Sequence, residues 1–341
     1  MFRARRLAAI LFALLPLLIA CTSTVPSTSG RSTVAGTPSG AAATALAATA
    51  AGATVNSRAT ATPSPVAATY PQTIQGSDGH TITLTQPPQR IVSLAAGYTE
   101  ILFAVGAGRQ VVAVDRFSDY PEATRSLPKL EYTNPSLEAL AALQPDLVLL
   151  GARQRSSAAT FEQAGLRVLL LNEPDSVAGV LERVRQISRL TGHATEGEAL
   201  VRSMQNRIDA IVRAVQGAPS QPKVYHELDA NLFSAAPNSF VGDLYTLLNA
   251  RNIVPVGPNP YPRLTNEAIV AANPDVIVLA DGTQPGSTPD EVKRRPGWDV
   301  ITAVRTGRIY VIDPNIVSRP GPRIVDALDM LAHDLYPDQF R

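Results

Sequence analysis

Two tyrosines and two glutamates recur at matched positions in two nineteen-residue stretches that begin 129 positions apart. In each stretch a Tyr (Tyr132, Tyr261) stands six residues before a Glu (Glu138, Glu267), and a Pro-Asp pair follows seven residues after that Glu. Seven of the nineteen aligned positions are identical. A Tyr offers a flat apolar ring and a hydroxyl group, which suit contact with a large conjugated ligand. The repetition predicts two similar structural units in one chain.

Side-chain patterns that mark common enzyme classes do not occur in the sequence. There is no G-x-S-x-G nucleophile motif, no G-x-x-x-x-G-K-[ST] and no G-x-G-x-x-G. The four histidines are scattered and form no H-E-x-x-H motif. We therefore expect neither enzymatic activity nor a structural metal site.

The N-terminal part of the chain is typical of targeting and tethering rather than of a fold. Residues 1–21 combine a cationic start, a 14-residue apolar stretch and the sequence Leu18-Ile19-Ala20-Cys21, as in a bacterial lipoprotein signal peptide. We expect Cys21, the only cysteine, to be lipidated and to become the new N-terminus. Residues 22–69 are almost entirely Thr, Ser, Ala, Gly and Pro, which predicts a disordered linker.

The charge of the remaining chain gives no reason to expect a nucleic-acid partner. The chain has 30 basic and 29 acidic residues, and five arginines but no acid precede residue 70. Residues 70–341 therefore carry 25 basic residues against 29 acidic ones, without a basic face. Their length is sufficient for two domains of ordinary size.

Strands and helices alternate along residues 70–341. A hairpin is predicted around Ser77-Asp78-Gly79, and Thr99 is expected to cap a helix that ends at Val105. The predicted strands are 90–94, 111–114, 146–150, 167–171, 223–228, 252–256, the repeated strand ending at Leu279, and 307–313. This alternation predicts parallel sheets covered by helices.

The longest helical stretch, residues 176–216, is expected to break near residues 191–193. We predict an α/β fold of two lobes with parallel-type sheets, joined by a single long helix. The expected division is an N-terminal lobe at 70–192, an interlobe helix at 193–216 and a C-terminal lobe at 217–341.

Loops at the carboxyl ends of parallel strands are where such folds bind ligands. Tyr132 and Tyr261 lie in such loops, each before a helix, and Phe117 lies in the long loop 115–131. Tyr98 follows the first strand of the lobe, and Arg319 could pair with an anionic ligand group. We predict ligand contacts at all five positions.

The chain resembles the ABC-transporter substrate-binding proteins that carry vitamin B12, ferric siderophores and haem. The resemblance covers about residues 70–341, and its clearest segments are RIVSLAAGYTEILFAVGAG (90–108), FSDYPEA (117–123), SLEALAALQPDLVLL (136–150), NSFVGDL (238–244), EAIVAANPDVIVLA (267–280), GRIYVID (307–313) and SRPGPRIVDAL (318–328). It is similar most of all to the cobalamin-binding members.

The resemblance implies that the ligand is a corrinoid, which carries its own metal and is held between the lobes without a further cofactor. By position, Phe117, Tyr132 and Tyr261 match aromatic cleft residues of the cobalamin-binding members, and Arg319 matches a cleft arginine. It also implies a lipid-anchored monomer outside the cytoplasm that docks onto a permease dimer coupled to a cytoplasmic ATPase. Glu138 and Glu267, one on each lobe, are the predicted docking pair.

Several alternatives remain at this point. The same family includes ferric-siderophore and haem receptors, and a Tyr near Tyr132 resembles the axial ligand of the haem-binding members. An enzyme, such as a metal-dependent hydrolase or a chelatase-like protein, is a second class. A sensor or adhesion lipoprotein that works without a transporter is a third.

Overall fold

The computed structural model describes residues 68–340. The predicted signal peptide with Cys21, and all of the predicted linker except its last two residues, lie outside this part of the chain. Among the described residues, no helix is both long enough and apolar enough to cross a membrane.

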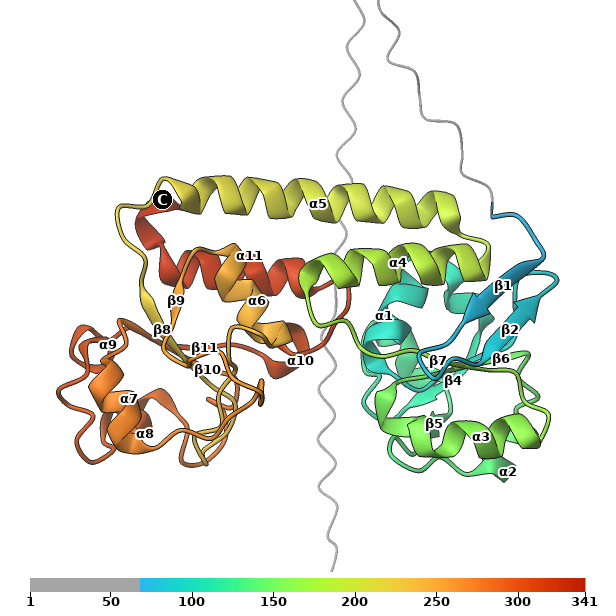
Figure 1. Cartoon of the computed structure of the whole chain (residues 1–341), viewed down its shortest axis with the longest axis horizontal. Helices are drawn as coiled ribbons and strands as arrows, with labels where there is room; N and C mark the ends of the chain where they lie inside the picture. Colours follow the sequence, from blue (N-terminus) through green and yellow to red (C-terminus); the bar gives the residue numbers. More distant parts are fainter. Residues whose placement is uncertain (1–67, 341) are drawn as a thin grey trace, which may run out of the picture. The chain divides into compact units, whose positions relative to one another are not determined.

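The N-terminal lobe contains a five-stranded sheet in the order β5-β4-β3-β6-β7, with every neighbouring pair parallel (Figure 1). Its strands are β3 (Ile91–Ser93), β4 (Val111–Asp115), β5 (Lys129–Leu130), β6 (Leu147–Leu150) and β7 (Val168–Leu170). Its helices are α1 (Ala96–Ala104), α2 (Leu137–Ala142) and α3 (Arg155–Gln163). The predicted hairpin forms from β1 (Gln72–Gln75) and β2 (Thr81–Leu84).

The C-terminal lobe contains a four-stranded parallel sheet in the order β11-β10-β8-β9. Its strands are β8 (Lys223–Glu227), β9 (Arg251–Asn252), β10 (Val276–Leu279) and β11 (Ile309–Val311). Its helices are α6 (Phe240–Leu247), α7 (Asn266–Ala272), α8 (Pro289–Lys293), α9 (Thr302–Thr306) and α10 (Pro314–Val317). Short 3₁₀ turns lie at Ala107–Gln110, Glu122–Ser126, Ala152–Gln154 and Pro337–Gln339.

Two sequence predictions about these elements were wrong. The strand expected at 252–256 ends at Asn252, because the Asn252 side chain accepts a hydrogen bond from the Val254 N–H (2.9 Å) and Pro255 has no N–H to donate. Thr99 does not cap α1, which begins at Ala96. Its buried hydroxyl instead bonds the hydroxyls of Ser93 (2.9 Å) and Ser118 (3.0 Å).

One long helix, α5 (Ala194–Gln216), joins the lobes, and two further long helices, α4 (Val177–Thr191) and α11 (Ile324–Leu335), pack against it. Figure 1 shows α5 extending over both lobes, with α4 beside its first half and α11 beside its second half. Gly192, with φ 85°, ends α4 at the predicted break. The predicted fold class is therefore confirmed.

The two repeats have the same local structure at their helix starts. Ser136 caps α2 by accepting a hydrogen bond from Ala139 N, and Thr265 caps α7 in the same way from Ala268 N, each at 3.2 Å. Both repeats also carry an acidic residue in the first turn of the helix.

The repeats also match where each helix passes into its strand. Gln144 and Asn273 occupy equivalent positions and both adopt left-handed backbone, with φ 47° and 46°. Asp146 then accepts a hydrogen bond from Arg90 N (2.9 Å), and Asp275 accepts one from the N–H of Lys223 (2.8 Å). Each Pro-Asp pair thus fastens its strand to the neighbouring strand, β6 to β3 and β10 to β8.

Candidate functional site

A cavity of about 560 Å³ lies between the two lobes. The N-terminal lobe contributes the chain from Ala95 to Tyr98, which follows β3, and the C-terminal lobe contributes Leu228, which follows β8. The cavity therefore lies at the carboxyl ends of the central strands, where parallel α/β sheets hold their ligands. All five residues with predicted ligand contacts line it.

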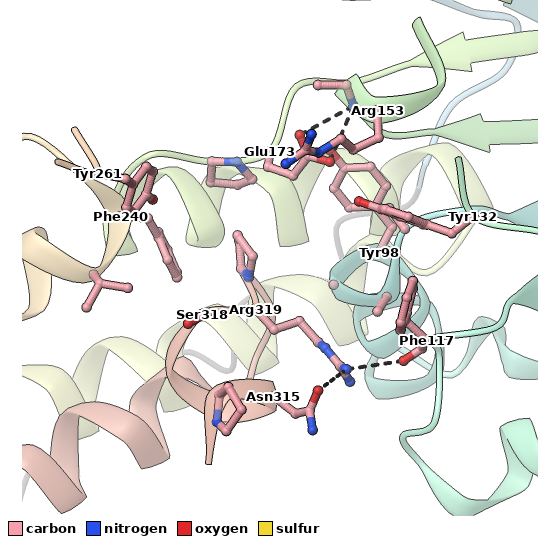
Figure 2. A pocket seen from close by; sticks show the side chains of 18 of the residues that line it. Tyr98, Phe117, Tyr132, Arg153, Glu173, Phe240, Tyr261, Asn315, Ser318 and Arg319 are labelled. Atoms are coloured by element: carbon pink, nitrogen blue, oxygen red, sulfur yellow. Dashed lines mark hydrogen bonds between the residues drawn. The ribbon is translucent and has the colours of Figure 1, made fainter. Parts of the chain in front are cut away.

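An aromatic wall forms the N-terminal side of the cavity. The rings of Phe117 and Tyr132 meet edge to face, with centroids 5.2 Å apart and an interplanar angle of 86°. Phe117 is 47% exposed, so much of its ring is available to a ligand. On the opposite side, Figure 2 shows Tyr261 and Phe240 of the C-terminal lobe.

The hydroxyl groups of these tyrosines are protonated in the neutral range. Burial raises the pKa of Tyr132, and the nearby Glu173 carboxylate raises it further. Burial also raises the pKa of Tyr261. Both side chains therefore offer a neutral ring and a hydroxyl rather than a phenolate.

Tyr98 forms part of the cavity floor. Its side chain is almost fully buried, and its hydroxyl donates a hydrogen bond to Leu171 O at 3.0 Å. The Arg183 guanidinium lies 5.4 Å from the ring centroid, and burial raises the pKa of Tyr98 strongly. Its hydroxyl is thus committed to the fold, and its ring is the part that can meet a ligand.

Arg319 lines the cavity but uses four of its five N–H donors on protein acceptors. Its NH1 group bonds Asp119 Oδ1 (2.7 Å) and Glu100 Oε1 (3.3 Å). Its NH2 group bonds Phe117 O (3.1 Å) and Asn315 Oδ1 (2.7 Å). Contact between this guanidinium and an anionic ligand group remains a prediction.

The sequence reasoning missed three polar residues of the N-terminal side. Arg153 and Glu173 line the cavity, and both Glu173 oxygens accept from Ala152 N at 3.3 Å. Gln154 is fully buried; its amide donates to Tyr132 O, and its Oε1 accepts from Gly151 N at 2.9 Å. Gln154 therefore fixes the loop that carries Tyr132. Arg153 and Gln154 follow β6 closely and Glu173 follows β7, and this position after a strand is the sequence signal that could have identified them.

Glu138 and Glu267 do not line the cavity. Both are exposed in the first turns of α2 and α7, one on each lobe. The hydroxyl of Ser136 donates to Glu138 Oε2 at 2.7 Å and lowers the pKa of Glu138, which keeps it charged. Their role in docking remains a prediction.

The described residues contain no group of three or more His, Cys, Asp or Glu side chains that could hold a metal ion. His226 is fully buried in β8, where its Nδ1 lies 2.6 Å from the Tyr245 hydroxyl. Burial lowers the pKa of His226 to about 3, so its imidazole is neutral. This histidine is a core residue and does not reach the cavity lining.

The chain is similar to known binding proteins over most of its length. It is 30% identical over 280 residues to the uncharacterized ABC transporter substrate-binding lipoprotein YvrC of Bacillus subtilis, covering 80% of this chain and 88% of that one. It is 30% identical over 281 residues to a cobalamin-binding protein of Halobacterium salinarum, covering 78% of this chain and 74% of the other. Among solved structures, the apo form of the periplasmic haem-binding protein RhuT from Roseiflexus sp. RS-1 superposes with a TM-score of 0.66 at 27% identity, covering 74% of this chain and 99% of that one.

The model of one family matches residues 91–316, which include the β3 strand, both repeats and all of the cavity lining except Ser318, Arg319 and Pro320. The chain therefore belongs to the periplasmic binding protein family.

Proposed function

We propose that this protein is the extracytoplasmic substrate-binding component of an ABC importer and that its ligand is a corrinoid such as cobalamin. The observation that carries this proposal is the interlobe cavity, whose two sides present aromatic rings from different lobes. A flat, conjugated macrocycle can contact the aromatic rings on both sides of the cavity at once. Aromatic side chains that a ligand buries in this way contribute a large share of the binding free energy.

The chemistry of the lining favours a corrinoid over haem. Haem iron in proteins takes an axial ligand from His, Cys, Met or Tyr. Among the described residues that line the cavity, only tyrosines belong to this set. Because burial raises the pKa of Tyr132 in the ligand-free protein, coordination of haem iron by this side chain would require loss of the hydroxyl proton. A cobalamin, in contrast, brings its own axial ligands and needs only shape and apolar contact from the protein.

The relatives include both a cobalamin-binding and a haem-binding protein. The Halobacterium salinarum protein is named for cobalamin and the Roseiflexus protein for haem, and this chain resembles each at about the same level. The choice between them therefore depends on the residues of this cavity rather than on overall similarity.

Delivery and location follow from the same proposal. The loaded protein would dock on a permease dimer through Glu138 and Glu267, whose exposed carboxylates lie on separate lobes. The chain would be held at the membrane, outside the cytoplasm, by lipid attached to Cys21. It would act as a monomer and would bind and release its ligand without chemical conversion.

The test is an absorption titration of the full-length protein, combined with calorimetry, using cyanocobalamin, haemin and a ferric siderophore separately. We expect one cyanocobalamin to bind per chain with a change in its visible spectrum. The proposed ligand would be wrong if haemin or the ferric siderophore bound tightly while cyanocobalamin did not. Chemical change of any bound compound would instead support an enzyme.

A further inference from the structure

The segment 315–323, which comprises the last three residues of α10 and the connection to α11 and is called the strap here, lies directly against α1 of the N-terminal lobe. A Cβ atom added to Gly97 would lie 2.6 Å from Pro320 O, and one added to Gly321 would lie 3.0 Å from a Glu100 carboxylate oxygen. Real side chains do not tolerate the first of these distances, so Gly97 permits the backbones to approach this closely. The strap is therefore a second connection between the lobes, separate from the long helices.

A single buried carboxylate of α1 holds two arginines of the strap. Arg323 binds Glu100 with two bonds, NH2 to Oε1 at 2.6 Å and Nε to Oε2 at 3.1 Å. Arg319 reaches the same Oε1 at 3.3 Å. The Glu100 side chain is only 2% exposed, and those of Arg319 and Arg323 are 11% and 17% exposed. Charge pairs with so little solvent contact are weakly screened and depend strongly on both partners.

The same network reaches the aromatic wall of the cavity. Arg319 donates to Phe117 O (3.1 Å) and to Asp119 (2.7 Å), both in the loop after β4 (Figure 2 shows the Phe117 bond). Arg323 covers the Tyr120 ring, with its guanidinium carbon 4.1 Å from the centroid. Two arginines of the C-terminal lobe thus hold the loop that presents Phe117 from the N-terminal lobe.

We propose that Glu100 is a positioning residue of the ligand cavity, which acts through Arg319 to fix Phe117 relative to the opposite lobe and thereby sets the width of the cavity and the residence time of the ligand. Only the residence time rests on the proposed function. The charge balance supports the assignment, because the two arginines face two acids, Glu100 and Asp119. Loss of the Glu100 charge leaves an excess positive charge in a buried contact, which favours separation of the strap from α1.

The test uses Glu100→Gln, which removes the charge and preserves the shape of the side chain. The full-length chain with Cys21→Ser would carry one spin label on each lobe, at Gln163→Cys and Arg305→Cys, both exposed positions. Pulsed electron paramagnetic resonance then gives the interlobe distance distribution without any ligand. Cyanocobalamin dissociation is measured separately by stopped flow.

We expect Glu100→Gln to broaden the distance distribution and to increase the dissociation rate of cyanocobalamin at least tenfold. The matched control is Glu122→Gln, which breaks the exposed Arg125–Glu122 pair in the same loop and is expected to change neither measurement. Arg319→Lys keeps the charge but loses the forked geometry, and it should broaden the distribution to a lesser extent.

A purely structural role for Glu100 would lower the melting temperature and leave the distance distribution unchanged, and that result would overturn the proposal. If Glu100→Gln does not fold, Asp119→Asn removes the outer, 59% exposed acid of the same network and should broaden the distribution; an unchanged distribution would refute the proposal. If the wild-type chain binds no corrinoid, the proposed function fails, and the distance measurement still decides the role of Glu100.

Discussion

Replacement of Phe117 with Ala tests whether the aromatic wall contacts the ligand. The Phe117 ring is 47% exposed in the free protein and packs edge to face against Tyr132. A ligand held between the lobes would cover this exposed part. We therefore expect truncation to weaken ligand binding far more than it lowers the stability of the fold. Only about half of the Phe117 side chain is buried in the free protein, so removing it costs the fold little buried area.

The expected magnitude follows from the exposed area. A phenylalanine side chain offers about 200 Å² to burial, so the 47% exposed fraction corresponds to about 95 Å². At about 25 cal/mol per Å², covering this area contributes about 2.4 kcal/mol. Since contact is rarely complete, we expect Phe117→Ala to cost about 1.5–2.5 kcal/mol, or about 10- to 70-fold in Kd. Tyr132→Ala should cost about 1–3 kcal/mol by the same reasoning.

The assay is calorimetric titration with cyanocobalamin, with thermal melts as a check on folding. Phe233→Ala is the matched control, since Phe233 is 38% exposed but does not line the cavity. The reasoning would be refuted if Phe117→Ala weakened binding no more than Phe233→Ala while both variants melted as the wild type does.

Four further predictions concern other parts of the chain. Cys21→Ser should release the protein from the membrane fraction, and a variant that stays there and carries lipid would show that the anchor lies elsewhere. Glu138→Ala with Glu267→Ala should leave ligand affinity unchanged while uptake or stimulated ATPase activity collapses, and the Arg replacements should be more harmful; normal transport would exclude a docking role. Because α5 and its partners join the lobes rigidly, ligand binding should close them by only a few degrees to about 10°, which small-angle scattering of free and loaded protein can measure. Burial raises the pKa of Asp334 to about 6, so the folded protein holds this proton more tightly than the unfolded chain does. The free energy of unfolding therefore falls as pH rises from about 4 through about 6. Asp334→Asn should stabilise the protein at about pH 7.5 and change its stability little near pH 4, as thermal melts at both pH values can show.

Local sequence signals were sufficient where each element depends on its own residues. The hairpin of β1 and β2 and the break at Gly192 are both determined within a few positions along the chain. The strand expected at 252–256 was wrong because a single side chain, Asn252, turns the backbone by bonding Val254 N and Ala235 O. The bond to Val254 N is local, but apolar periodicity does not reveal a side-chain bond, and the bond to Ala235 O joins residues 17 positions apart.

The candidate site was predictable only where a sequence pattern marks its residues. Tyr132 and Tyr261 were found because the repeat marks both, and both line the cavity. Gln154 was missed because its importance comes from a bond to the backbone of Tyr132, 22 residues away. Arg319 was expected to be available for an anionic ligand, but four of its N–H donors bond residues that include Glu100, 219 positions earlier.

The sequence repeat accounts for the structure within each lobe better than it accounts for ligand recognition. The matched features, namely the caps, the left-handed residues and the aspartates that fasten neighbouring strands, are contacts within one lobe, so duplication of a segment preserves them. The cavity is different, because it combines Tyr132 and Tyr261, the first residues of the two repeats, with segments that lie outside the repeats. Phe117 lies in a loop before the first repeat, and Arg319 lies in the strap after the second. We therefore expect ligand choice to depend on the unrepeated loop and strap as well as on the two tyrosines, and Phe117, which is 47% exposed, is the position where substitution most directly separates ligand recognition from folding.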